Sequence, residues 1–175
     1  SVGGATATGT HGSGMGLGAL SAAVSAVEVL GADGELRAVR RGDSDFDGSV
    51  VALGALGITT RVTVDVQPSY RMRQDAYSDL PWDEFLTHLP EVFSAGYSVC
   101  LFTEWDGRVR EVLVKSRVPD GADDIDVPES VFGARRMPPR EPSDRVTPVD
   151  GSVGAWCDRL PHFLIGGTPS NGSEI

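Results

Sequence analysis

The sequence has no long apolar run of the kind that crosses a membrane. No stretch approaches the roughly 20 apolar residues that a spanning helix needs. No charged segment followed by an apolar core marks a secretory signal either. We therefore expect no membrane partner and a cytoplasmic location.

Cysteine and histidine are scarce. Cys100 and Cys157 lie far apart, without the C-x-x-C spacing of a zinc or redox site. The histidines at 11, 88 and 162 show no H-x-x-x-H pairing. We expect two reduced thiols and no bound metal.

Basic residues are outnumbered. Lys and Arg total 15 against 25 Asp and Glu, which gives a formal net charge of -10, and the acids are scattered along the chain. A nucleic-acid surface needs a basic patch, so we expect no nucleic-acid partner. The 40% share of apolar residues is enough for a folded core.

What stands out is the opening segment, SVGGATATGTHGSGMGLGAL, which contains no charged residue. Glycine allows a ligand to approach the main chain closely, and backbone N–H groups bind phosphates well. A flexible linker is the alternative, but the β-branched threonines of GGATATGTHG stiffen the chain. The composition therefore favours binding of a phosphate or a planar cofactor.

Three familiar motifs fit this segment poorly. Gly14, Gly16 and Ala19 match G-x-G-x-x-A, but no hydrophobic strand precedes them and no long amphipathic helix follows. A Walker loop needs G-K-[ST] after the glycines, and that string is absent. A nucleophile elbow needs glycine two residues before the serine, but the residue two before Ser13 is His11. A nicotinamide site, a Walker loop and a nucleophile elbow are therefore disfavoured.

Residues 1–68 are predicted to form the first of two domains. Two strands, around 27–29 and 36–38, are joined by GADGE, which has the Asp-Gly chemistry of a hairpin turn. A short helix with Ser44 or Asp45 as its N-cap comes next. ITTRVTVDVQP then alternates as a half-buried strand and stops at Pro68.

Residues 69–175 are predicted to form the second domain. A strand with one polar face from Tyr70 is followed by a helix from Pro81, which Pro90 bends or ends. YSVCLFTEW and VREVLVKSRV read as a hairpin. The proline-rich residues 118–155 are predicted to be a long loop or disordered crossing, and packed structure returns at WCDRLPHF. The fold class is α+β.

The strings SVGGATATGTHGSG, LSAAVSAVEVLGADGELRAVRRGD and VVALGALGITTRVTVDVQP carry a resemblance. They resemble the flavin-binding (PCMH-type) domain of the vanillyl-alcohol-oxidase superfamily, and within it the alditol (xylitol) oxidases, which are relatives of the sugar-lactone oxidases. The resemblance covers about residues 1–118 and returns at LPHF and TPSNGSEI. It implies the C-terminal part of a flavin-binding domain in 1–68 and the start of an antiparallel substrate domain in 69–175. We expect the chain to be an internal segment of a longer protein, which would make the rest of that polypeptide one of its partners.

The resemblance also implies a cofactor site for FAD. It places two sets of residues against FAD, the second of them near the adenine end: Ser1, Gly4, Ala5, Thr6, Ala7 and Thr8, and then Gly57 and Ile58. A covalent histidyl link would come from a residue outside the segment, so His11 is interpreted as a structural residue that holds the loop by hydrogen bonds. His162 and Phe163 either pack against other residues of the domain or border the substrate cleft.

The implied reaction is oxidation of the primary alcohol of a polyol to an aldehyde, with O2 reduced to hydrogen peroxide. In the family the catalytic side chains come from sequence outside this segment, so no catalytic residue is assigned, and the segment alone is expected to be inactive. Two alternatives remain open. One is a sugar-1,4-lactone oxidase or dehydrogenase of the same superfamily, and the other is an inactive homologue that serves as an interaction module.

Overall fold

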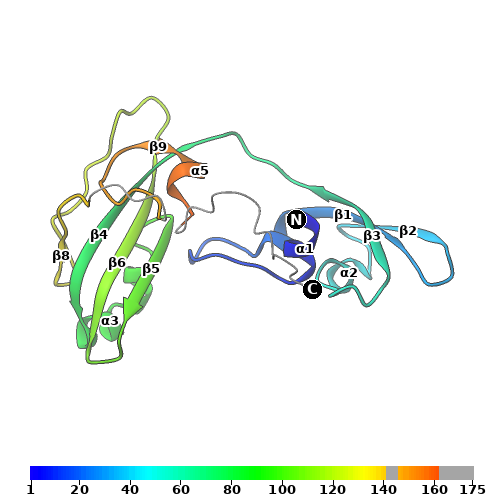
Figure 1. Ribbon diagram of the computed structural model, residues 1–175, viewed down its shortest axis with the longest axis horizontal. Coiled ribbons are helices and arrows are strands. Elements are labelled where there is room, and N and C mark those ends of the chain that lie inside the picture. The colour runs from blue at the N-terminus through cyan, green and yellow to red at the C-terminus, as the bar shows by residue number, and fades with distance from the viewer. Residues whose placement is uncertain (141–145, 162–175) are drawn as a thin grey trace, which may run out of the picture. The chain divides into compact units, whose positions relative to one another are not determined.

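The computed structural model describes residues 1–140 and 146–161, and these residues form two compact units (Figure 1). Unit 1 contains residues 1–12 and 16–68. Unit 2 contains residues 13–15, 69–140 and 146–161 of the described chain. Each unit has its own sheet, and the two are described separately.

Unit 1 is built on a three-stranded antiparallel sheet in the order β2-β1-β3. Its helices and strands are α1 (Val2–Ala7), the 3-10 helix η1 (Leu20–Ala23), β1 (Val24–Leu30), β2 (Leu36–Arg40), α2 (Phe46–Val50) and β3 (Ile58–Val64). Phe46 and Val50 of α2 pack on three valines of β1 to form the buried core of this unit.

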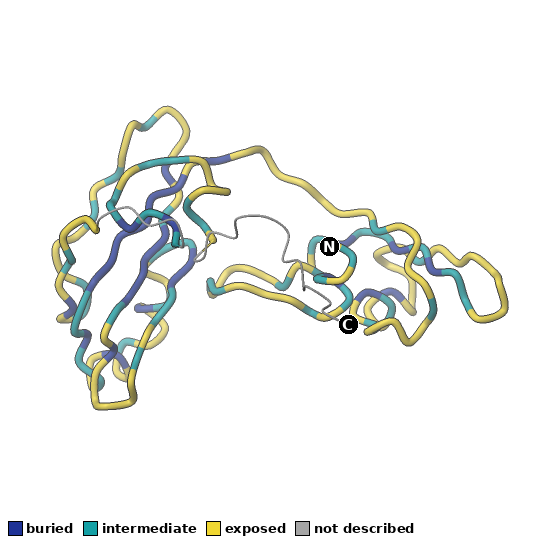
Figure 2. The backbone as a smooth tube through the Cα atoms, in the orientation of Figure 1, coloured by how far each residue is buried: buried dark blue, intermediate teal, exposed yellow. Residues whose placement is uncertain are grey.

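The β1–β2 hairpin confirms the prediction made from GADGE. The Gly31 N–H donates to the Glu35 carbonyl at 2.9 Å, and Gly34 takes a φ of +80°, which glycine adopts without steric cost. The helix α2 also forms with Asp45 at its N-cap, although the Asp45 side chain makes no capping hydrogen bond. The prediction of a half-buried β3 was wrong, because only Val62 is partly buried and the remaining residues of that strand are exposed (Figure 2).

Unit 2 is built on a six-stranded antiparallel sheet in which β5, β6, β4, β8 and β7 follow one another and β9 pairs with β4. The elements are β4 (Arg71–Pro81), α3 (Trp82–Thr87), α4 (Leu89–Phe93), β5 (Ser98–Thr103), β6 (Arg108–Val118), β7 (Ser130–Val131), β8 (Ala134–Arg136), β9 (Gly154–Ala155) and α5 (Trp156–Arg159). Figure 1 shows the long strands β4, β6 and β5 lying side by side.

The sheet of unit 2 is covered on both faces. Tyr77, Val112 and Val114 belong to a large apolar cluster with Phe85 and Val92 of the helices, whereas Ala76 and Leu113 pack with Val149 on the opposite face. The predicted strand with one polar face forms as β4, and its polar face is buried. Residues 72–77 of β4 are all buried (Figure 2), including Arg73, Gln74 and Asp75.

The proline positions shape the rest of unit 2. Pro81 ends β4 and caps α3, while Pro90 lies in the first turn of α4, so the single helix predicted from Pro81 is two helices that meet at His88. Three short strands, β7, β8 and β9, lie within 118–155, where the sequence predicted only a loop or crossing.

Within the described residues, no helix is long and apolar enough to cross a membrane.

Candidate functional site

The opening segment forms the helix α1 rather than the extended loop expected from its glycines. Ser1 is the N-cap, and its Oγ accepts a hydrogen bond from the Gly4 N–H at 3.2 Å. The Ala5 N–H donates to the Ser1 carbonyl at 3.0 Å, and the Thr8 N–H donates to the Gly4 carbonyl at 3.1 Å. These amide groups already have partners inside the helix, so they do not form an open row of phosphate donors.

The threonine hydroxyls are also used within α1. Thr6 Oγ1 donates to the Gly3 carbonyl at 3.0 Å, and Thr8 Oγ1 donates to the Gly4 carbonyl at 3.0 Å. Helical threonines commonly bond to a carbonyl three or four residues earlier. Both hydroxyl protons are therefore used in hydrogen bonds inside α1.

Helix periodicity divides the predicted site residues between two faces of α1. Ser1, Gly4, Ala5 and Thr8 share one face, where three are exposed and Ala5 is partly so. Thr6 is only 3% exposed and points inward. The outer face therefore carries no side chain larger than threonine, which allows a flat group to lie close to the helix backbone.

The second predicted segment lies next to α1 in unit 1. Gly3, Thr6 and Ala7 line the same small hollow as Gly54, Leu56 and Gly57. The Leu53 N–H donates to the Ala7 carbonyl at 3.2 Å, which ties the loop before β3 to α1. The structure thus brings together two segments that are about 50 residues apart in the sequence.

Gly57 is glycine for a structural reason. Its φ is +133°, and a Cβ atom there would lie 2.2 Å from the carbonyl oxygen of Leu30 on β1. No other residue fits this approach without moving the backbone. Ile58 pairs with Leu30 and leaves 68% of its surface exposed, so an apolar side chain is available beside the turn.

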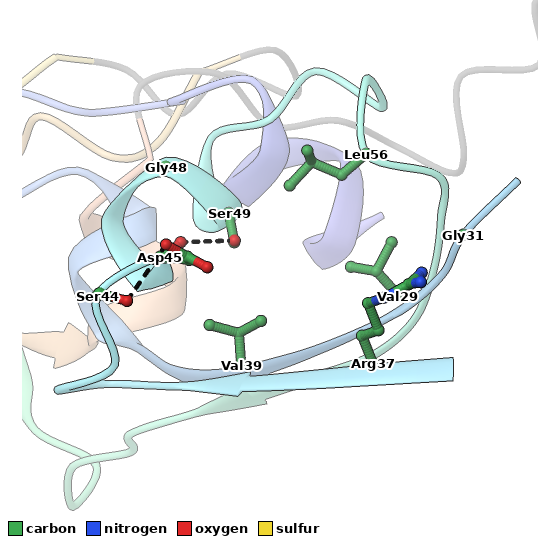
Figure 3. Close-up of a pocket in the computed structure, with 9 residues that line it drawn as sticks. All are labelled: Val29, Gly31, Arg37, Val39, Ser44, Asp45, Gly48, Ser49 and Leu56. Carbon is green, nitrogen blue, oxygen red and sulfur yellow. Dashed lines mark hydrogen bonds between the residues drawn. The ribbon is translucent and has the colours of Figure 1, made fainter. Parts of the chain in front are cut away.

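A larger cavity of about 600 Å³ opens between the β1–β2 hairpin and α2 (Figure 3). Val29, Val39 and Leu56 provide apolar walls, while Ser44 and Ser49 flank Asp45 on the opposite side. Its volume falls within the range of small-molecule sites. Its lining comes from separate segments of the chain, so no local motif could have indicated it.

One ion pair stands at the edge of this cavity. The Arg37 guanidinium donates to both carboxylate oxygens of Asp33, and the Asp33 side chain also accepts from the Glu35 N–H at 3.1 Å. The hydrogen bond from Arg37 is the main cause that lowers the pKa of Asp33 to about 2. Both side chains are exposed, so the pair contributes little to stability.

A buried ionic cluster in unit 2 was not foreseen. Asp75 is 3% exposed and accepts from Arg73 Nε at 2.7 Å and from Arg136 Nη2 at 2.7 Å, while Arg73 also donates to Asp124 at 2.8 Å. The hydrogen bond that Arg73 donates to Asp75 is the first cause that raises the pKa of Arg73, and burial opposes it. The cluster fastens residues 124 and 136 to β4, and alternating polarity along one strand cannot reveal such distant partners.

The histidines contribute little to a site. His11 is exposed, and its Nδ1 lies 3.2 Å from the carbonyl oxygen of the adjacent Gly12, so this contact does not hold the segment to another element. His162 and Phe163 fall outside the described residues. Within residues 1–140 and 146–161, no group of three or more His, Cys, Asp and Glu side chains could hold a metal ion.

Comparisons with known proteins give consistent relatives. The chain is 39% identical over its whole length to an alditol oxidase from Streptomyces sp. and spans 42% of that protein. It is 38% identical over 74 residues to an L-gulono-1,4-lactone dehydrogenase from Mycobacterium tuberculosis, a match that covers 42% of this chain and 17% of the relative. No family model matches the chain.

The fold has a relative among solved structures. A cholesterol oxidase mutant from Brevibacterium sterolicum superposes with a TM-score of 0.57 at 21% identity, covering 73% of this chain and 28% of that one. At this identity the likeness concerns the fold alone, and it supports the α+β class with antiparallel sheets. The identity that runs along the whole chain carries the family assignment. The chain belongs to the family of this alditol oxidase, of whose length it spans 42%.

Proposed function

We propose that this chain is part of an FAD-dependent alcohol oxidase that converts the primary alcohol of a polyol to an aldehyde and reduces O2 to hydrogen peroxide. The observation that carries the cofactor assignment is the outer face of α1, where the small side chains of Ser1, Gly4, Ala5 and Thr8 let a flat group lie close to the helix. The relative named alditol oxidase supports the substrate class. The chain spans less than half of that relative, so the proposal concerns the whole protein.

The residues of unit 1 fit FAD in shape and polarity. Small side chains on α1 let an extended dinucleotide approach, and the exposed Ser1 hydroxyl offers a polar atom near it. Ile58 supplies an exposed apolar surface for the adenine end, next to the turn that Gly57 makes. Thr6 contributes indirectly, because its buried side chain packs α1 inward and so orients the outer face.

The chemistry divides between cofactor and chain. FAD, when bound, accepts the hydride from the substrate and passes electrons to O2. The residues of this chain would bind and orient it: α1 along one side and Ile58 at the adenine end. No side chain of the described segments is assigned to polarising the substrate hydroxyl.

Flavin retention tests the binding surface. In the intact protein, Gly4→Val should lower the bound flavin at least tenfold, because the new isopropyl group stands on the outer face of α1. Its Cβ would lie 3.3 Å from Ser1 Oγ, a contact that a side-chain rotation relieves, so the apoprotein should still fold. Gly16→Val is the matched control, since no atom lies within 4 Å of a Cβ at that position. Equal flavin content in both variants would remove the α1 surface from the site.

Product formation tests the reaction. Hydrogen peroxide should appear when the flavin-loaded protein is given xylitol or sorbitol in air, and it should appear more slowly with L-gulono-1,4-lactone. The opposite preference would favour the lactone-oxidising alternative, which the lactone dehydrogenase relative represents. Turnover of the lactone with an artificial acceptor but not with O2 would indicate a dehydrogenase. A protein that binds no flavin and turns over neither substrate would favour the interaction module.

A further inference from the structure

A second cavity, of about 440 Å³, lies within unit 2 on the face of the sheet that α3 and α4 cover. Tyr77 of β4 and Val114 and Ser116 of β6 form its base. α4 and the turn after it contribute Glu91 and Ala95, and the segment 125–132 supplies most of the remaining lining. The volume falls within the range of small-molecule sites.

The segment 125–132 has little regular structure, yet it is fastened to the sheet. Asp124, immediately before it, accepts from the buried Arg73 at 2.8 Å, and the Tyr77 hydroxyl donates to the Pro128 carbonyl at 2.9 Å. A buried arginine is costly unless its charge is compensated, so its pairing with Asp124 holds the start of the segment in place. The cavity is therefore bounded by a fixed wall.

The other end of this wall is a turn with an unfavourable residue. β7 and β8 are joined by Phe132 and Gly133, whose φ angles are +49° and +86°. Such two-residue turns favour asparagine, aspartate or glycine, and a bulky residue at positive φ is an outlier. The Phe132 ring stacks on His88, with 4.9 Å between the ring centroids, and it lines the cavity. A phenylalanine held in this way is consistent with a role for its ring in the cavity wall.

The polar groups of the lining are of one kind. The Glu91 and Asp126 carboxylates and the Ser116 and Ser130 hydroxyls have no hydrogen-bond or ion-pair partner among the described residues. No lysine, arginine or histidine of the described chain lines the cavity, and the rest of the lining is mainly apolar. Ionised carboxylates only accept hydrogen bonds, so the lining matches a ligand that donates them and carries a positive charge.

We propose that this cavity binds a small amphipathic amine. The apolar body of the amine packs against Val114, Val127 and Phe132, and its ammonium group donates to the Glu91 and Asp126 carboxylates. A neutral alcohol of the same shape gains only the apolar contacts, and a carboxylate in the same position is repelled. The site shares no residue with the α1 surface of unit 1, so it does not rest on the proposed flavin function.

The test titrates the intact protein with three indole probes by calorimetry. Tryptamine carries an ammonium group, tryptophol has a hydroxyl in its place, and indole-3-acetate has a carboxylate. Tryptamine should bind about tenfold more tightly than tryptophol, because only the ammonium forms charge-assisted hydrogen bonds, and indole-3-acetate should bind most weakly. Equal affinity for tryptamine and tryptophol, or no binding of tryptamine, would overturn the proposal.

Variants then locate the bound amine. Ala95 is exposed, so Ala95→Trp should fold, fill the cavity and abolish tryptamine binding. Glu91→Gln and Asp126→Asn should each weaken tryptamine several-fold and leave tryptophol unchanged, which keeps the test decisive if Ala95→Trp is unfolded. Asp120→Asn is the matched control, because it removes the same charge from an exposed residue outside the lining. Full tryptamine binding in a folded Ala95→Trp protein would overturn the proposal, as would an equal loss in Asp120→Asn and in the two cavity variants.

Discussion

Gly57→Ala should destabilise unit 1 far more than Gly54→Ala, although both glycines lie in the same loop. At Gly57 the φ is +133° and a Cβ would lie 2.2 Å from the Leu30 carbonyl oxygen, whereas at Gly54 the φ is +80° and no atom lies within 4 Å. Left-handed backbone costs an alanine about 1 to 2 kcal/mol, and forcing a close contact adds about 1 to 3 kcal/mol. Replacing glycine by alanine also reduces the conformational entropy of the unfolded chain. This stabilises both variants equally, so it cancels when their stabilities are compared.

The difference between the two variants should therefore be about 2 kcal/mol. Hydrogen exchange with mass spectrometry can measure it in unit 1 alone, using peptides that cover β1 and β3. About 2 kcal/mol corresponds to roughly 30-fold faster exchange in Gly57→Ala than in Gly54→Ala. The comparison is made without FAD, so equal exchange in the two variants would refute the structural role of Gly57 and leave cofactor contact as its explanation.

Three predictions concern unit 2, measured by urea unfolding with tryptophan fluorescence. Asp75→Asn should cost about 3 to 5 kcal/mol, because it leaves two arginines without a buried counter-charge; a loss below about 1 kcal/mol would contradict this. Arg73 lowers the pKa of Asp124, so their ion pair stabilises unit 2 fully above pH about 3.9, the ordinary pKa of an aspartate. That stabilisation is lost as the pH falls through the folded-state pKa of Asp124. Asp124→Asn should therefore reduce the acid sensitivity of unit 2, and an unchanged acid midpoint would count against the ion pair. Burial lowers the pKa of Lys115, so the unfolded chain binds more protons between the folded-state pKa and the ordinary pKa of about 10.4; stability should rise with pH across that interval, and Lys115→Met should remove the rise.

Local signals were sufficient where neighbours in sequence determine the structure. The Asp33-Gly34 turn predicted the β1–β2 hairpin, because the hydrogen bonds that close it join residues a few positions apart. Pro90 correctly indicated a break in the helix from Pro81, since its ring excludes the preceding turn. The α+β class and the flavoenzyme family followed from the resemblance of the quoted strings, and the comparisons support both.

Other features depend on partners that a local pattern cannot specify. The sequence predicted a polar face on β4 but not its burial: Arg73 and Asp75 are buried because Asp124 and Arg136, more than 50 residues later, satisfy their charges. The glycines of α1 suggested open backbone, yet the Ser1 cap closes the first turn into a helix. The proposed FAD contacts and the assignment of residues 1–68 and 69–175 to cofactor and substrate domains remain predictions.

The central claim is that the intact protein is a flavin alcohol oxidase, and its visible spectrum tests this most directly. The purified full-length protein is examined under nitrogen before and after addition of xylitol. The account predicts flavin absorption bands that bleach with the polyol and return when air is admitted. A protein that stays colourless after incubation with FAD, or flavin bands that no polyol bleaches, would contradict it.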